Sequence, residues 1–129
     1  MPNEFTITKT KVYKVKPDPN NLNFGTVFTD HMFLMNYSKD KGWHDGRIVP
    51  YGPICLDPAA SVFHYGQEIF EGMKAYRSAD QKTLLFRPGM NDKRAIYSCE
   101  RMCIPPLPEG LLTEAVKALV KTDSDWIPD

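Results

Sequence analysis

The sequence has no long apolar run. No stretch of its 129 residues approaches the ~18 consecutive apolar residues that a membrane-spanning helix needs. The first residues, MPNEFT, also lack the basic-then-apolar pattern of a secretory signal. We therefore expect no membrane partner and a cytoplasmic location.

An excess of either charge is missing too. Sixteen basic residues balance sixteen acidic ones. Proteins that bind nucleic acids usually carry a basic excess, because neutralising phosphates drives their affinity. We expect no nucleic-acid partner.

Cysteine and histidine are sparse. The three cysteines, Cys55, Cys99 and Cys103, are odd in number and lack a paired spacing, which argues against a disulfide framework. Cys99 and Cys103 stand four apart on a predicted helix, where packed, reduced thiols are favoured over a redox pair. The three histidines are dispersed, so no metal site is expected.

Glycine-rich nucleotide loops and the serine-hydrolase elbow are absent as well. The chain contains no G-x-G-x-x-G, no G-x-x-x-x-G-K-[ST] and no G-x-S-x-G. Nucleotide-binding and serine-hydrolase functions lose support accordingly.

The first half of the chain predicts strands. A short strand is expected at residues 11–15, followed by a loop. Residues 30–37 are apolar on both alternating faces, which is typical of a central strand. Residues 38–46 predict a turn, and residues 47–51 a further strand despite Pro50.

A hairpin and two helices follow. Residues 69–77 alternate and predict a strand that pairs antiparallel with residues 83–87. Asn91 is expected to cap a helix that Pro105 and Pro106 terminate. A second helix is expected to begin near Pro108. Its apolar stripe is Leu111, Leu112, Ala115, Val116, Leu119 and Val120.

Strands come before helices without alternation, which predicts an α+β domain with an antiparallel sheet and flanking helices. We assign residues 1–25 to an N-terminal strand and loop, 26–122 to one small domain, and 123–129 to the start of a linker.

Two places could carry chemistry. Tyr65 and Phe70 flank Gly66, whose backbone can bend sharply, and they are interpreted either as core aromatics or as the wall of a pocket. Arg94 is expected on a helix one turn before Ser98. It could offer a planar fork to a phosphate, or it could be a solvated surface arginine.

Seven motifs, in order and at matching spacing, resemble the branched-chain amino acid aminotransferase family. They are FTDHM (28–32), KGW (41–43), HYG (64–66), FEGMKAY (70–76), LFRP (85–88), RMCIP (101–105) and DWIPD (125–129). The resemblance covers most of the chain from about residue 24. It departs from the family pattern at Asp92 and Ala95, where a methionine and a larger apolar residue are usual.

The resemblance implies a fold type IV enzyme that uses pyridoxal 5'-phosphate. Such enzymes have a small N-terminal α+β domain and a larger C-terminal domain, with the cofactor between them. The Schiff-base lysine is in the larger domain, so no catalytic residue is expected here, and the chain alone is expected to be inactive. The implied reactants are leucine, isoleucine and valine, their branched 2-oxo acids, and 2-oxoglutarate with glutamate.

Carried onto matching positions, the resemblance assigns Arg94 to the cofactor phosphate. It assigns Tyr65 and Phe70 to the substrate pocket, Tyr65 reaching the partner subunit of a homodimer, and places Lys74 near the cleft. Two alternatives stay open: another enzyme of the same fold, such as a D-amino acid aminotransferase, and a non-enzymatic α+β interaction module.

Overall fold

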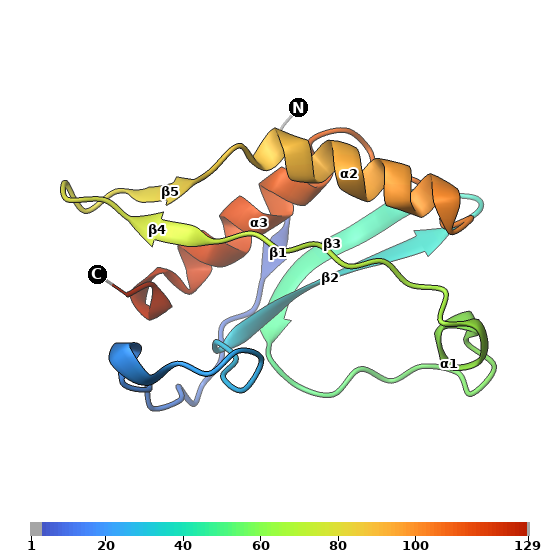
Figure 1. Cartoon of the computed structure of the whole chain (residues 1–129). Coiled ribbons are helices and arrows are strands. Elements are labelled where there is room, and N and C mark those ends of the chain that lie inside the picture. The colour runs from blue at the N-terminus through green and yellow to red at the C-terminus, as the bar shows by residue number, and fades with distance from the viewer. Residues whose placement is uncertain (1–3, 129) are drawn as a thin grey trace.

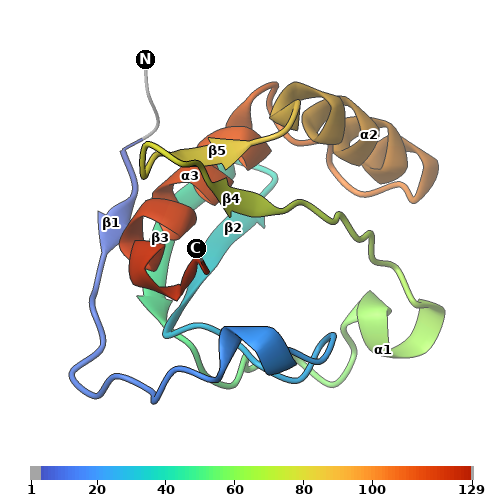
Figure 2. The same ribbon diagram turned by 60° about the vertical axis from the view of Figure 1, so that its left-hand side comes forward.

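A computed structural model describes residues 4–128 (Figure 1). One sheet has the strand order β1-β3-β2, and its strands are β1 (Thr6–Ile7), β2 (His31–Ser38) and β3 (Gly42–Pro50). A separate pair is formed by β4 (Ala75–Arg77) and β5 (Thr83–Leu85). Three helices accompany them, and Figure 2 shows α1 (Ser61–Tyr65) standing apart from the sheet and from α3 (Leu111–Thr122). The α+β class expected from the element order is confirmed.

The central hairpin joins β2 (His31–Ser38) to β3 (Gly42–Pro50) in an antiparallel register that pairs His31 with Pro50. The expected strand at residues 30–37 is therefore confirmed. The expected turn at residues 38–46 is too long, because β3 already begins at Gly42. Gly42 and Asp45 have φ values of 68° and 54°, so turn-forming residues lie inside an irregular strand.

β2 is an edge strand rather than the central strand that its sequence indicated. β3 is central, flanked on its other side by β1 (Thr6–Ile7), which runs parallel to it. Apolar side chains on both faces of a strand indicate that other elements pack above and below the sheet. They do not indicate which strands pair with its two edges, and the prediction was wrong for this reason.

The strand expected at residues 11–15 was also wrong. Val12 and Val15 are 81% and 94% exposed, and no strand forms there. Backbone groups in and next to this segment bind side chains instead: the amide of Lys14 donates to Asp30, and that of the preceding Thr10 donates to Nε2 of His31.

Two helices complete the core. α2 (Pro88–Arg101) begins three residues before the expected cap at Asn91, because Arg87 adopts a left-handed cap conformation and Pro88 starts the helix. α3 (Leu111–Thr122) contacts both α2 and the strands β2 and β3, and so forms the middle layer. The buried apolar residues are Ile48, Ala95, Cys99, Leu111 and Ala115.

The cysteine prediction holds in part. All three cysteines are free, and Cys99 is buried in α2. Cys103 is exposed and lies beyond the end of the helix with φ at 55°, so the expected packing of both thiols on one helix face was wrong.

The second hairpin is confirmed, but it is shorter than expected. β4 (Ala75–Arg77) pairs antiparallel with β5 (Thr83–Leu85), and residues 69–74 belong to no strand. The short helix α1 (Ser61–Tyr65) was not predicted. Two 3-10 turns occupy Pro19–Asn21 and Ser124–Trp126.

The C-terminal residues pack onto the start of β2. Asp123 is 5% exposed, and the indole of Trp126 donates to Asp30 at 2.8 Å. The division of the chain at residues 25 and 122 stays a prediction, and Met1–Asn3 and Asp129 lie outside the described residues. Across residues 4–128, no helix is both long and apolar enough to cross a membrane.

Candidate functional site

The segment between α1 and β4 runs alongside α2 (Figure 1). It begins at Gly66, whose left-handed conformation (φ 55°, ψ 35°) ends α1 and bends the chain as its sequence indicated. The side-chain amide of Gln67 then donates to the carbonyl oxygen of Met102 at 2.9 Å. This segment therefore carries Phe70, Glu71 and Lys74 past the helix that carries Arg94.

Arg94 and Glu71 form a two-point ion pair. Nε of Arg94 lies 2.6 Å from Oε1 of Glu71, and Nη2 lies 2.7 Å from Oε2. Asn91, one turn before Arg94, donates its amide to Oε2 of Glu71 at 2.8 Å and to the carbonyl oxygen of Gly72 at 3.0 Å. Positions three apart on a helix share a face, so α2 holds the segment at two adjacent points.

The two partners differ in exposure. The Glu71 side chain is 12% exposed, whereas that of Arg94 is 62% exposed. Hydrogen bonds from Arg94, and then from Asn91, lower the pKa of Glu71 although partial burial acts in the opposite direction. Glu71 in turn raises the pKa of Arg94. The pair is therefore fully ionised near neutral pH.

A cavity of about 390 Å³, which we name the Arg94 cavity, opens beside this pair. Its lining residues are Glu68, Ile69, Phe70, Arg94, Tyr97, Ser98, Arg101 and Met102. Two arginines and a serine hydroxyl suit an anion, while the Phe70 ring offers an apolar wall. The structure thus brings Phe70, Arg94 and Ser98 together at one cavity.

Tyr65 lies in an adjoining cavity of about 360 Å³ that shares Arg101 and Met102 with the Arg94 cavity. Tyr65 is 84% exposed and Phe70 is 92% exposed, so the interpretation of these two residues as core aromatics was wrong. Lys74 is exposed and lines neither cavity.

Sequence reasoning missed the roles of Glu71 and Arg101. Both belong to quoted motifs, but only the fold shows that Glu71 faces Arg94 and that Arg101 connects the two cavities. The spacing of Asn91 and Arg94 was a usable signal, because two polar side chains on one turn can grip a single carboxylate.

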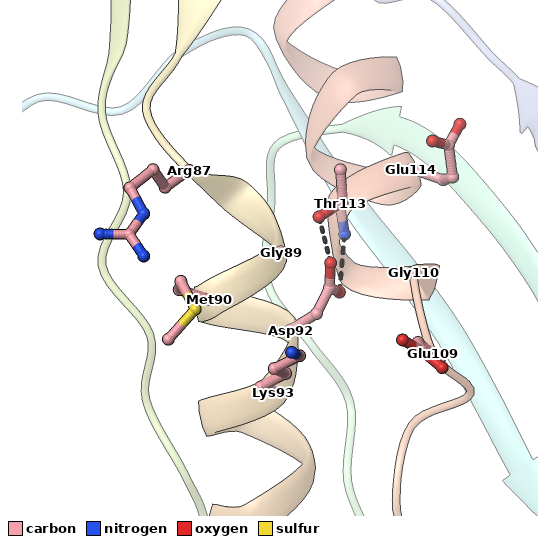
Figure 3. Close-up of a pocket in the computed structure, with 9 residues that line it drawn as sticks. All are labelled: Arg87, Gly89, Met90, Asp92, Lys93, Glu109, Gly110, Thr113 and Glu114. Atoms are coloured by element: carbon pink, nitrogen blue, oxygen red, sulfur yellow. Dashed lines mark hydrogen bonds between the residues drawn. The ribbon is translucent and has the colours of Figure 1, made fainter.

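A larger cavity, of about 530 Å³, lies between the N-terminal parts of α2 and α3 (Figure 3). Asp92 points across the gap and accepts hydrogen bonds from the amide and the hydroxyl of Thr113. This buried carboxylate caps the start of α3, which explains how the fold accommodates Asp92 at a buried position. Because the cavity's central polar groups are already paired with each other, we favour the Arg94 cavity as the functional site.

Residues 4–128 contain no group of three or more histidine, cysteine, aspartate or glutamate side chains that could hold an ion.

Curated proteins of known name match nearly the whole chain. Branched-chain-amino-acid transaminase 1 of Bacillus subtilis (strain 168) is 58% identical over 120 residues, which are 93% of this chain and 34% of that protein. Branched-chain-amino-acid aminotransferase 2 of the same organism is 57% identical over 123 residues, which are 95% and 33% respectively. The branched-chain-amino-acid aminotransferase of Mycolicibacterium smegmatis is 50% identical over 108 residues.

No family model matches the chain. The chain spans about a third of the length of the curated relatives that it matches. Identity of 58% over 93% of the chain, together with the expected α+β fold, confirms the resemblance found in the motifs. The chain is a homologue of the N-terminal part of branched-chain-amino-acid aminotransferases.

Proposed function

We propose that this chain is the N-terminal domain of a pyridoxal-phosphate-dependent branched-chain amino acid aminotransferase. The parent protein would transfer amino groups between leucine, isoleucine or valine and 2-oxoglutarate. The observation that carries this proposal is the 58% identity over 93% of the chain to a relative named for that activity. The chain itself would be inactive, because the lysine that binds the cofactor covalently would lie in the remaining two-thirds of the protein.

The Arg94 cavity fits one end of the cofactor. A phosphate dianion suits a planar guanidinium, a serine hydroxyl and a second arginine, and Arg94, Ser98 and Arg101 supply these groups. When bound, pyridoxal phosphate would supply the aldehyde that accepts the amino group and the ring that withdraws electrons from the α-carbon. Arg94 would anchor the phosphate without moving a proton.

Phe70 and Tyr65 would shape the place of the substrate side chain. Both rings are largely exposed, as expected of a wall that another part of a protein or a ligand covers. An apolar wall favours branched side chains by about 0.8 kcal/mol for each methylene buried. Lys74, at the end of the same segment, would lie at the margin of the cleft.

The assembly and location of the parent protein are also proposals. We infer a cytoplasmic homodimer in which Tyr65 reaches the partner subunit's site and the larger C-terminal domain closes the cavity. The exposed Tyr65 ring, at the end of a helix that stands apart from the sheet, supports this arrangement (Figure 2).

The test is the activity of the parent protein. Its gene should encode, beyond Asp129, a larger second domain with a candidate Schiff-base lysine. The purified parent protein should transaminate L-leucine with 2-oxoglutarate and should leave D-alanine unchanged. Turnover of D-alanine in place of leucine would reassign the protein within its fold. A reading frame that stops at Asp129 would favour the interaction module.

A further inference from the structure

The Glu71–Arg94 ion pair uses only one edge of the guanidinium. Nε and Nη2 of Arg94 point to the two carboxylate oxygens of Glu71. Within residues 4–128, the other edge, formed by Nη1 and the second hydrogen of Nη2, makes no hydrogen bond. A guanidinium carries five N–H donors in a fixed plane, so three remain for a ligand.

Glu71 is well suited to fix that plane. Its side chain is mostly buried, while the arginine that it holds is mostly exposed. Asn91 also binds the carboxylate, and through Gly72 it binds the backbone next to it. A carboxylate held from a second side can set the direction of a long side chain that would otherwise sample many rotamers.

Resting on the proposed function, we propose that Glu71 is a positioning residue for the cofactor phosphate. It holds Arg94 by the Nε–Nη2 edge and leaves the Nη1–Nη2 edge to bind the phosphate. Asn91 supports Glu71 in the same role. Because Arg94 lines the cavity and Glu71 does not, the carboxylate acts through the arginine rather than by touching the ligand.

Glu71 could affect phosphate binding in two opposite ways, and experiment can separate them. Its negative charge repels a phosphate dianion, and this repulsion alone would weaken binding. Fixing the Arg94 side chain strengthens binding, because the side chain has already lost its conformational entropy before the ligand binds. The sign of the change when Glu71 is removed decides which effect is larger.

The test is a double-mutant cycle in the parent protein. The dissociation constant of pyridoxal phosphate is measured by titrating the cofactor-free protein. Glu71→Ala should raise it about 10-fold, as is usual when a group that orients a ligand-binding side chain is lost. Glu71→Gln, which keeps one acceptor, should give a smaller rise. In an Arg94→Ala background, Glu71→Ala should produce no further change.

A matched control removes a carboxylate elsewhere. Glu114→Ala breaks the ion pair with Lys117 (2.9 Å) on α3 and should leave the dissociation constant unchanged. Melting temperatures of the cofactor-free variants report the structural effect of losing the Glu71–Arg94 ion pair, separately from any effect on cofactor binding.

The outcomes separate the two proposals. If Arg94→Ala weakens cofactor binding but Glu71→Ala does not, or does so equally in both backgrounds, the positioning role is wrong and the phosphate role stands. If both Glu71 variants bind the cofactor more tightly, repulsion is the larger effect and the positioning role is again wrong. If Arg94→Ala leaves binding unchanged, the phosphate role itself fails, and the positioning role fails with it.

Discussion

Nδ1 of His31 lies 2.6 Å from Oδ1 of Asp123, although 92 positions separate the two residues in the sequence. The amide of Thr10 donates to Nε2 of the same ring, so Nε2 carries a lone pair and the proton is on Nδ1, which donates to Asp123. One neutral imidazole therefore joins the N-terminal segment, the start of β2 and the end of α3.

We predict that Asp123→Asn lowers the free energy of unfolding by about 2 kcal/mol, because a buried, charge-assisted hydrogen bond is replaced by a weaker one. Asp123 also accepts a hydrogen bond from the amide of His31, which adds to the loss. Urea denaturation of the two proteins measures the difference. Asp125→Asn is the matched control, since Asp125 is 61% exposed and should change stability little. Equal effects at both positions would contradict the network.

Asp30 should make stability depend on pH. Burial would raise the pKa of Asp30, but hydrogen bonds from the Lys14 amide and the Trp126 indole, with the charge of Lys14, outweigh it and lower the pKa. A lowered carboxyl pKa adds stability that is complete above the unfolded value of about 3.9 and is lost as pH falls through the folded value.

We therefore expect the Asp30→Asn variant to be less stable than the unmodified chain near neutral pH. The difference in free energy of unfolding between the two proteins should shrink as pH falls below about 4. Denaturation midpoints across pH 2.5 to 7 would show the convergence. A difference between the two proteins that stays constant over this range would show that the charge of Asp30 contributes nothing.

Arg94→Ala in the parent protein should weaken retention of pyridoxal phosphate by roughly 10-fold to 100-fold, the usual worth of a charge-assisted hydrogen bond. Equilibrium dialysis measures the cofactor that remains bound. Lys93→Ala, an exposed basic residue next to it on α2, is the control and should retain the cofactor. Unchanged retention in Arg94→Ala would remove this residue from the phosphate role.

Phe70→Ala should reduce discrimination in favour of branched substrates. In the proposed site the Phe70 ring would contact substrate methyl groups, each worth about 0.8 kcal/mol, so kcat/KM for L-leucine should fall more than that for L-alanine. Phe86→Ala is a suitable comparison, because Phe86 is also exposed, at 77%, and lines neither site cavity. An equal fall for both substrates would argue against a selective wall.

The sequence predicted the fold class and most elements whose signals are local. An apolar run covering both faces located β2, alternation located the second hairpin, and the apolar stripe located α3. It failed where distant residues decide the conformation. The amides of Thr10 and Lys14 donate to side chains of His31 and Asp30 rather than to a neighbouring strand, and β2 takes its edge position from pairing that no local pattern reports.

The sequence proposed candidate residues for the site but not the contacts between them. Arg94, Phe70 and Tyr65 were found from motifs, and the fold brings the first two into one cavity. The pairing of Glu71 with Arg94 joins residues 23 positions apart, and it depends on the segment after Gly66 running alongside α2. Only the three-dimensional structure could reveal it.

Phe70 and Glu71 are consecutive in the chain, and this adjacency limits redesign of the enzyme we propose. A substitution that enlarges the pocket by shifting the backbone at Phe70 would also displace the carboxylate of the next residue, Glu71. A wider substrate range would then come with weaker binding of pyridoxal phosphate. Engineers who want a wider specificity should therefore begin at Tyr97 or Met102, which line the same cavity from α2 and its C-terminal end.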